Sequence, residues 1–225
     1  MARIDWAASR RLGRVPKGIA LNELRPAEFL GELDPMVGVY ASAMNADRWT
    51  LPGRRQLMNQ HVNFPEFRAI AARRPRRGTL VGFAYGFRGS AGQWWYDSVR
   101  MALASDAGIG PDAAQAWMGD CMEIAEVHVH PRFQRRGIGT GMLAQLTDGR
   151  SEQTALLSTP DRESTARRLY RQLGFTDLLI GYYFPGGSPP YAIMGALLPL
   201  RDPKVAPGSP GADIGARHPA SPSVW

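Results

Sequence analysis

Apolar and polar positions recur along the chain with two different periods, which divide it into helical and extended segments. Between residues 26 and 45 apolar side chains recur at helical spacing and predict an amphipathic helix. Pro35 lies inside this segment, so we expect the helix to be kinked or split in two. A second helical stretch is predicted from about residue 54 to residue 72, with an interruption near Pro65. Helices are therefore expected before the first strand.

Short apolar segments typical of buried strands follow. Residues 79–87 (TLVGFAYGF) lie between Gly78 and Gly89, and residues 121–130 (CMEIAEVHVH) end at Pro131. The rest of the pattern predicts a helix at 137–146, a strand at 154–158, a helix at 163–173 and strands at 177–184 and 191–198. This order predicts a mixed α/β domain.

The domain organisation follows from the segments between and after these elements. Residues 89–117 combine an amphipathic stretch at 94–103 with a Gly- and Asp-rich stretch at 105–112, and we interpret them as an insertion between strands. Residues 1–200 are expected to form one domain that carries this insertion. Residues 201–225 contain many prolines among Gly, Ser and Ala, with too few apolar side chains to offset the entropy of ordering. They are predicted to be a disordered tail.

Charge and cysteine content narrow the class of protein. The formal net charge is +7 and the pI is near 10.1, which fits either a nucleic-acid partner or a polyanionic cofactor. The first two basic clusters, at residues 10–17 and 68–77, lack the aromatic or Gly-rich register of a known nucleic-acid module, which argues against that partner. No apolar run of about 18 residues could cross a membrane, and residues 1–14 lack the apolar stretch of a secretory signal. With Cys121 as the single cysteine, we expect a reduced, cytoplasmic protein with this residue buried in a strand.

The segment between the strand at 121–130 and the next helix carries the clearest chemistry. Gln134-Arg135-Arg136-Gly137-Ile138-Gly139 lies where consecutive backbone N–H groups and a helix N-terminus can point at one anion. Glycine allows the backbone to approach phosphate oxygens, and the arginines add positive charge. The spacing fits neither the six-residue dinucleotide fingerprint nor the Walker P-loop. The segment is therefore predicted to bind a pyrophosphate.

The sequence here resembles the acyl-CoA-binding motif of the GNAT superfamily of N-acetyltransferases. The family's strand, written Glu-apolar-x-x-apolar-x-Val, is similar to residues 123–129, and its Gln/Arg-x-x-Gly-x-Gly/Ala turn is similar to residues 134–139. A second family motif, Ala-x-x-x-Tyr-x-x-x-Gly-Phe, is matched from Ala166 through Tyr170 to Phe175. The resemblance covers about residues 118–175. It implies a central, mostly antiparallel sheet that is splayed at the acyl-CoA site and flanked by helices, with acetyl-CoA as co-substrate.

The resemblance also implies which residues bind this co-substrate. The backbones of Val127 and Val129 would pair with the pantetheine arm as an added strand does. The pyrophosphate would be held by Gln134 and by the turn and first helical residues, namely Arg135, Arg136, Gly137, Ile138, Gly139 and Thr140. A family asparagine is replaced here by Glu163, which cannot donate an amide hydrogen bond. Ser164 is a candidate to replace that contact, with Arg167 beside it.

Direct acetyl transfer to an amine requires a general base and a general acid. Glu123 stands at the spacing of the general base in histone-acetylating members of the family, and Glu126 is the competing candidate. Strict alternation places the two on opposite faces of a strand, but this strand commonly carries a bulge in the family. A water chain or another residue stays open as the base. Tyr170 matches the family's general acid for the CoA sulfur.

His128 and His130 share parity with Glu126, which admits a metal site or a proton relay. The family requires no metal, and the residues that follow serve the phosphate turn, so we expect no metal ion.

The acceptor is expected between the first helices and the last strands. Its candidate lining comprises Met44, Trp49, Tyr182, Tyr183 and the loop 186–190, with residues 94–97 of the insertion as a wall or lid. A polycationic acceptor calls for an acidic pocket, and this chain is basic, so a small primary amine is expected in preference to an aminoglycoside or a protein amine. A non-catalytic acyl-CoA-binding module, a protein or peptide acetyltransferase and a longer acyl donor are alternatives, and a homodimer is left open.

Overall fold

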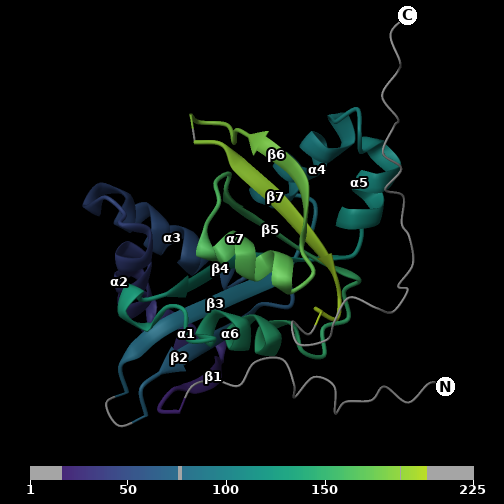
Figure 1. Cartoon of the computed structure of the whole chain (residues 1–225). Helices are drawn as coiled ribbons and strands as arrows, with labels where there is room; N and C mark the ends of the chain where they lie inside the picture. Colours follow the sequence, from purple (N-terminus) through teal and green to yellow (C-terminus); the bar gives the residue numbers. More distant parts are fainter. Residues whose placement is uncertain (1–16, 76–77, 188, 202–225) are drawn as a thin grey trace, which may run out of the picture.

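Seven strands form one sheet in the part of the chain that the computed structural model describes, which comprises residues 17–75, 78–187 and 189–201. The sheet order is β1-β2-β3-β4-β5-β7-β6 (Figure 1). Only β4 and β5 pair in parallel, and the other neighbours are antiparallel. The strands are β1 (Ala20–Leu24), β2 (Arg68–Arg73), β3 (Leu80–Arg88), β4 (Cys121–Val129), β5 (Thr154–Pro160), β6 (Thr176–Tyr182) and β7 (Tyr191–Leu197).

Seven α-helices and two short 3-10 turns of the described residues flank this sheet. They are α1 (Pro26–Gly31), α2 (Leu33–Met44), η2 (Arg48–Thr50), α3 (Leu51–His61), α4 (Trp94–Ser105), α5 (Gly110–Met118), η3 (Pro131–Phe133), α6 (Ile138–Thr147) and α7 (Thr165–Gln172). The predicted mixed α/β fold with a mostly antiparallel, splayed sheet is confirmed. None of these helices is long and apolar enough to cross a membrane.

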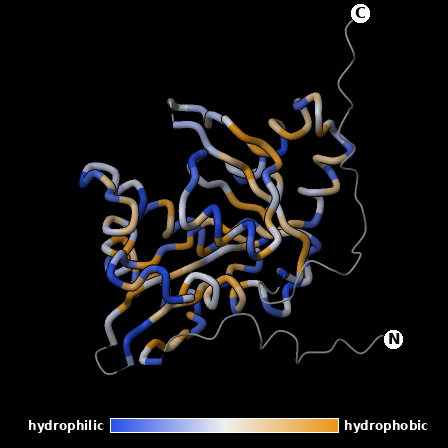
Figure 2. The backbone as a smooth tube through the Cα atoms, in the orientation of Figure 1, coloured by the Kyte–Doolittle hydropathy of each residue, from blue (hydrophilic) through white to orange (hydrophobic). Residues whose placement is uncertain are grey.

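The helices form two layers. On one face, α1, α2 and α3 pack on the aromatic residues of β3, among them Phe83 and Tyr85, while α4 and α5 pack on Leu156 of β5 and Ile193 of β7. On the other face, α6 and α7 cover the inner strands through residues such as Met142. Figure 2 shows hydrophobic colour along the inner strands and hydrophilic colour on much of α7. One face of the sheet thus carries two separate helical groups, and the site lies between them.

The predicted break in the first helix occurs, although not at the proline. The helix divides at Glu32, whose backbone leaves helical geometry (φ −106°, ψ 7°). Pro35 lies in the first turn of α2. Backbone N–H groups in the first turn have no acceptor within the helix, so a proline there costs no helical hydrogen bond. The proline therefore marks the start of the second helix.

The predicted helix over residues 54–72 is wrong in its second half. The first part is α3, but Arg68–Arg73 is β2, between β1 and β3. The residues 69–72 are all buried, so both faces of this strand are covered and the alternation that identifies a strand is missing. Strand β1, at the sheet edge, was also not predicted, because its five residues carry little apolar pattern.

The segment 89–117, interpreted as an insertion, contains α4 and most of α5. These two helices pack on β5, β7 and the segment before β7. Trp117 of α5 lies over Gly195 of β7, where an added Cβ atom would stand 2.9 Å from the indole ring. Cys121 is a free, buried cysteine of the same cluster, as expected. Most of the predicted tail, residues 202–225, and the N-terminal segment 1–16 lie outside the described residues.

Candidate active site

The site begins where β4 and β5 separate. The two strands pair over three residues only, from Cys121↔Thr154 to Glu123↔Leu156, and then diverge (Figure 1). His130 N–H donates to the Val81 carbonyl on the β3 side (2.8 Å). Because backbone groups alternate in direction along a strand, Val127 and Val129 direct theirs to the open side. This edge of β4 therefore offers free backbone groups to an extended partner.

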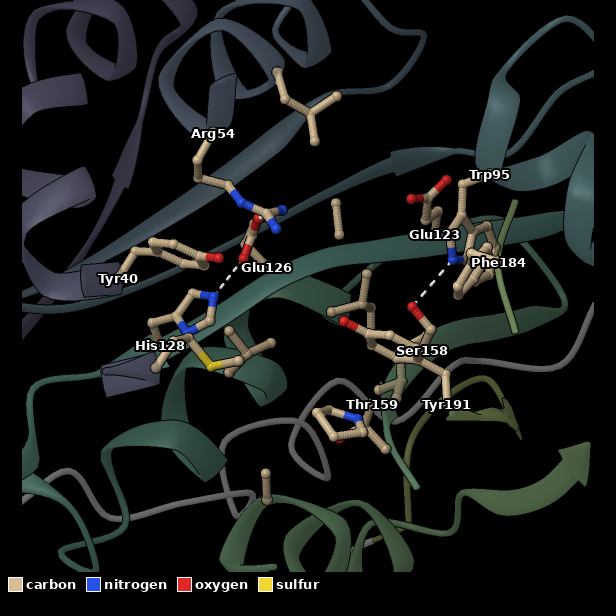
Figure 3. Close-up of a pocket in the computed structure, with 18 of the residues that line it drawn as sticks. Tyr40, Arg54, Trp95, Glu123, Glu126, His128, Ser158, Thr159, Phe184 and Tyr191 are labelled. Atoms are coloured by element: carbon tan, nitrogen blue, oxygen red, sulfur yellow. Dashed lines mark hydrogen bonds and ion pairs between the residues drawn. The ribbon is translucent and has the colours of Figure 1, made fainter. Parts of the chain in front are cut away.

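A cavity of about 780 Å³ runs through this opening and along the face that carries the two helical groups. Its walls come from α2 and α3 on one side and from α4 and the β6–β7 loop on the other. β4 forms its floor with residues 123–128 (Figure 3). Tyr170 of α7 also lines the cavity. The cavity thus connects the open strand edge with the face on which both glutamates of β4 lie.

A bulge in β4 brings these two glutamates to one face. Tyr85 of β3 pairs with Glu126, while its neighbour Gly86 pairs with Ile124, so Ala125 has no partner and counts as the extra residue. Glu123 and Glu126, three positions apart, consequently both line the cavity. Gly86 is required opposite the bulge, because an added Cβ atom would stand 2.4 Å from the Glu123 carbonyl oxygen.

Glu126 is held by two partners. Arg54 of α3 donates to its carboxylate (2.6 Å), and His128 contacts the other carboxylate oxygen. The Arg54 guanidinium also lies 4.7 Å from the centroid of the Tyr40 ring, which packs edge-on against His128. Burial of Glu126 would raise its pKa, but the charges and hydrogen bonds of His128 and Arg54 outweigh this effect and lower the pKa. Glu126 is therefore ionised, and each of its carboxylate oxygens has a partner.

Glu123 has the opposite environment. It is 5% exposed, and among the described residues no side chain donates a hydrogen bond to its carboxylate. Burial, and then the charge of Glu126, raise the pKa of Glu123 to about 8. Figure 3 shows its carboxylate beside Trp95, at the end of the cavity away from His128. Glu123 can therefore exchange a proton near neutral pH.

Tyr170 approaches the cavity from the α7 side. It is 8% exposed, and its ring packs on Phe175 at a centroid distance of 5.8 Å. Within the described residues its hydroxyl has no hydrogen-bond partner. Burial and the charge of Glu126 raise the pKa of Tyr170, so the hydroxyl stays protonated and able to donate.

The predicted phosphate turn has the backbone geometry of an anion site. Arg135 and Gly137 both have positive φ (58° and 78°), and α6 begins directly afterwards without a side-chain cap. The first amides of α6, at Ile138, Gly139 and Thr140, therefore have no intrahelical acceptor. The side chains of Arg135 and Arg136 are exposed. Gln134 lines the cavity and donates to the Val129 carbonyl (2.9 Å), which links the turn to the open strand.

Two of these helical residues also have packing roles. The Ile138 side chain is buried in the core beneath α6. An added Cβ atom at Gly139 would stand 3.1 Å from Leu169 of α7, so this glycine allows the two helices to approach closely.

The residues predicted around the start of α7 divide into two groups. Ser164 lines the cavity, and its hydroxyl accepts the Arg167 N–H as the helix cap (3.1 Å). The Arg167 guanidinium instead forms ion pairs with Asp161 and Asp177 (2.5 and 2.9 Å) and is absent from the described cavity lining. Glu163 pairs with Arg171 (2.6 Å).

Part of the predicted acceptor lining lies in the cavity. Met44, Trp94, Trp95, Gly186 and Gly187 line the cavity. Five of the other candidates are absent from the described lining. Trp49 and Tyr183 are exposed. The hydroxyls of Tyr182 and Tyr96 donate hydrogen bonds to the carbonyls of Ser98 and Met118, and the Asp97 carboxylate accepts one from the Gly92 N–H.

Several lining residues were missed by sequence reasoning. Arg54, Tyr40, Phe184 and Tyr191 line the cavity without belonging to a local motif. Arg54 lies 72 positions from Glu126, the carboxylate it pairs with. The amphipathic pattern of the first helices and the aromatic residues of the last strands indicate the segments on which these four residues lie, but not that their side chains line the cavity. In the described part of the chain, no group of three or more His, Cys, Asp or Glu residues could hold a metal ion.

Comparison with known proteins gives consistent findings. Residues 70–177 match the family described as Acetyltransferase (GNAT) domain. The sequence is 33% identical over 205 residues to the GCN5-like protein acetyltransferase Rv2170 of Mycobacterium tuberculosis, and the match covers 81% of this chain and 99% of that protein.

Two solved structures share the architecture. One is NAA60 of Arabidopsis thaliana in complex with a bisubstrate analogue (18% identity, TM-score 0.53, 80% of this chain and 97% of that chain). The other is the PaiA N-acetyltransferase of Thermoplasma acidophilum in complex with coenzyme A (12% identity, TM-score 0.50, 80% and 98%). At these identities the two structures show a shared fold.

Proposed function

The chain belongs to the GNAT family of acetyltransferases, and from this premise we propose that it transfers an acetyl group directly from acetyl-CoA to the primary amine of a small molecule. One observation carries the proposal. Glu123, a buried carboxylate without a hydrogen-bond partner among the described residues, and Tyr170, a protonated hydroxyl, open into one cavity beside the outward-facing edge of β4.

The residues present fit acetyl-CoA. The outward-facing backbone groups of Val127 and the Val129 N–H suit the amide groups of pantetheine, which can pair as an added strand does, while the Val129 carbonyl already accepts from Gln134. The uncapped start of α6, together with Arg135 and Arg136, suits the pyrophosphate. When bound, acetyl-CoA supplies the acetyl group as a reactive thioester. Ser164 lines the same opening, whereas Arg167 is engaged by two aspartates and acts as an anchor of α7.

Glu123 is the general base of this proposal. An amine reaches the site mainly as an ammonium ion and must lose a proton before its nitrogen can attack. The Glu123 carboxylate is free to accept that proton, and its pKa of about 8 matches the task near neutral pH. Glu126 is less suited, because Arg54 and His128 occupy its oxygens. Its charge instead helps to set the proton affinity of Glu123.

Tyr170 is the general acid. As the new C–N bond forms and the C–S bond breaks, the departing sulfur needs a proton. The Tyr170 hydroxyl is protonated at neutral pH and has no competing acceptor among the described residues. The nitrogen loses two protons in all. Glu123 takes the first from the ammonium ion and later releases it to solvent. The second leaves the nitrogen after the C–N bond has formed and replaces the proton that Tyr170 gives to the sulfur.

A protein amine is the second candidate acceptor, and one observation favours it. The relative that is 33% identical is described as a protein acetyltransferase. A protein lysine would use the same base and acid, so the acceptor has to be decided by experiment.

The first experiment measures acetyl-CoA binding by calorimetry and thiol release against a panel of small amines and lysine peptides. We expect binding together with amine-dependent release. Tyr170→Phe is expected to lower kcat by about 10²-fold or more, a typical contribution of a positioned acid, while acetyl-CoA binding is retained. Tyr183→Phe makes the same change at an exposed tyrosine outside the described cavity lining and serves as the control.

The outcomes separate the alternatives. Binding without thiol release from any amine would favour a non-catalytic acyl-CoA-binding module. No binding at all would overturn the proposal. Release with a peptide alone would select the protein acceptor.

A further inference from the structure

One end of the cavity is built from aromatic rings, and two of them come from the insertion. Trp94 of α4 lies against Phe184, with ring centroids 5.4 Å apart, and Phe184 lies against Tyr191 at the same distance. The Trp95 indole N–H donates to the hydroxyl of Ser158 on β5 (3.1 Å). This bond fixes Trp95 at the point where β5 leaves β4. We call Trp94, Trp95, Phe184 and Tyr191 the aromatic end of the cavity.

The proposed base lies at this same end. Figure 3 shows the Glu123 carboxylate beside the Trp95 indole, with Phe184 and Tyr191 close by and His128 at the far end. The reacting nitrogen must come within hydrogen-bond reach of Glu123. A group attached to that nitrogen can therefore reach the aromatic end.

The charges around the cavity limit how many amines the acceptor can carry. Among the described lining residues the carboxylates are Glu123 and Glu126, and Glu126 is already paired with Arg54 and His128. Arg162 adds a further cation to the lining. One ammonium group can be neutralised here, beside Glu123. A second or third ammonium on the same molecule would find no carboxylate free to receive it.

We propose that the aromatic end, two of whose four rings come from α4, is an acceptor subsite for monoamines whose primary amine is joined by a short alkyl chain to a flat aromatic body. This inference rests on the function proposed above and names its substrate class. Flat rings pack edge-to-face or offset against aromatic side chains, and each such pair adds stabilisation beyond the burial of area. The ammonium gains from the same ring faces before Glu123 removes its proton. Polyamines and aminoglycosides lack a flat aromatic ring, and they carry more ammonium groups than the cavity can neutralise.

The first test compares acceptors at saturating acetyl-CoA, using 2-phenylethylamine, n-butylamine, spermidine and a lysine peptide with blocked ends. We expect kcat/KM for 2-phenylethylamine to exceed that for n-butylamine by about tenfold or more, since one or two ring contacts correspond to about that factor. Spermidine and the peptide are expected to be poorer still. Equal values for 2-phenylethylamine and n-butylamine, or a preference for the peptide, would overturn the subsite.

The second test removes one ring. Trp94 is 58% exposed, so Trp94→Ala should fold. It is expected to lower kcat/KM for 2-phenylethylamine about tenfold, mostly through KM, and to affect n-butylamine much less. Trp49→Ala is the matched control, because Trp49 is 93% exposed and outside the described cavity lining. An equal loss for both amines in Trp94→Ala would contradict the proposal.

A binding measurement separates this inference from the proposed function. Calorimetry of 2-phenylethylamine with the CoA-bound protein should show binding that Trp94→Ala weakens and Trp49→Ala leaves unchanged. If acetyl-CoA does not bind, or no amine of the panel causes thiol release, the proposed function fails and the subsite with it. If other amines are acetylated and 2-phenylethylamine neither binds nor reacts, the function stands and the subsite alone is wrong.

Discussion

At the scale of single residues, two carboxylates of β4 have opposite environments, which shift their pKa values in opposite directions. Glu126 has an arginine and a histidine as partners, whereas Glu123 is buried without either. Pairs of titratable groups whose environments separate their pKa values are a frequent sign of acid–base chemistry. The two glutamates can therefore be distinguished by how each affects the pH dependence of the reaction.

The pH profile of kcat/KM tests the assignment of Glu123. A base must be unprotonated, so kcat/KM should rise with pH through an inflection near 8, the pKa of Glu123. Glu126→Gln removes a nearby negative charge, lowers the pKa of Glu123 and should move this inflection to lower pH. Glu123→Gln should abolish both the inflection and most of the activity. An unchanged inflection in Glu123→Gln would point to another base.

The same residue predicts an effect on stability. The pKa of Glu123 is raised from 4.5 to about 8 in the folded protein, so between these pH values the folded state keeps a proton that the unfolded chain has lost. The free energy of unfolding therefore falls as the pH rises from about 4.5 to 8, and the penalty is complete above 8. Glu123→Gln removes the penalty and should raise the free energy of unfolding by roughly 1–4 kcal/mol at pH 9, with little gain at pH 5.

Urea denaturation at the two pH values measures this difference. Glu66→Gln, the same change at an exposed glutamate, serves as the control. A gain in Glu123→Gln of equal size at both pH values would show that packing, and not ionisation, is responsible.

At the scale of secondary-structure elements, the bulge in β4 positions Glu123, the proposed base. Gly86→Ala introduces a Cβ atom 2.4 Å from the Glu123 carbonyl oxygen, so the bulge has to shift and Glu123 with it. We expect kcat to fall by more than about tenfold, with a stability loss of about 1–3 kcal/mol, the usual cost of overpacking. Gly53→Ala, in α3 with open space around the new Cβ atom, should leave kcat unchanged and not destabilise the protein. Full activity in Gly86→Ala would mean that the bulge does not position the base.

The docking of α4 and α5 on the sheet is a second feature at this scale. Gly195→Ala places a Cβ atom 2.9 Å from the Trp117 ring and from Leu178, so α5 must move away from β7. Hydrogen exchange should become faster in α4 and α5 and remain unchanged in α1 and α2, which pack elsewhere. Uniformly faster exchange would indicate global destabilisation without undocking.

The elements also show what a single sequence can reveal. Strands with a local apolar pattern, such as β3, β4 and β7, were predicted closely, and so was the helix that carries Tyr170. β2 was taken for a helix, because a strand buried on both faces shows no alternation. The candidate base, acid and phosphate turn lie in short local motifs, so sequence could propose them. Arg54 could not be found in this way, because only the folded chain brings α3 to β4.

At the scale of the whole molecule, the two parts of the sheet meet through three residue pairs of β4 and β5. Binding of CoA along the free edge of β4 should slow hydrogen exchange in residues 124–129 and raise the melting temperature. A ligand that binds only the folded state adds about 2.7 kcal/mol at 100 times its Kd. Exchange and calorimetry with CoA alone measure both effects. Slower exchange confined to the α6 turn would show that the pantetheine arm does not pair with β4.

In the proposed complex, acetyl-CoA extends the sheet along the edge of β4 that lies beyond its three pairs with β5. A protease that attacks locally opened chains would meet fewer open molecules when acetyl-CoA is abundant and more when it is scarce. The lifetime of this enzyme in a cell would then follow the supply of acetyl groups, without any change in the rate at which the chain is synthesised.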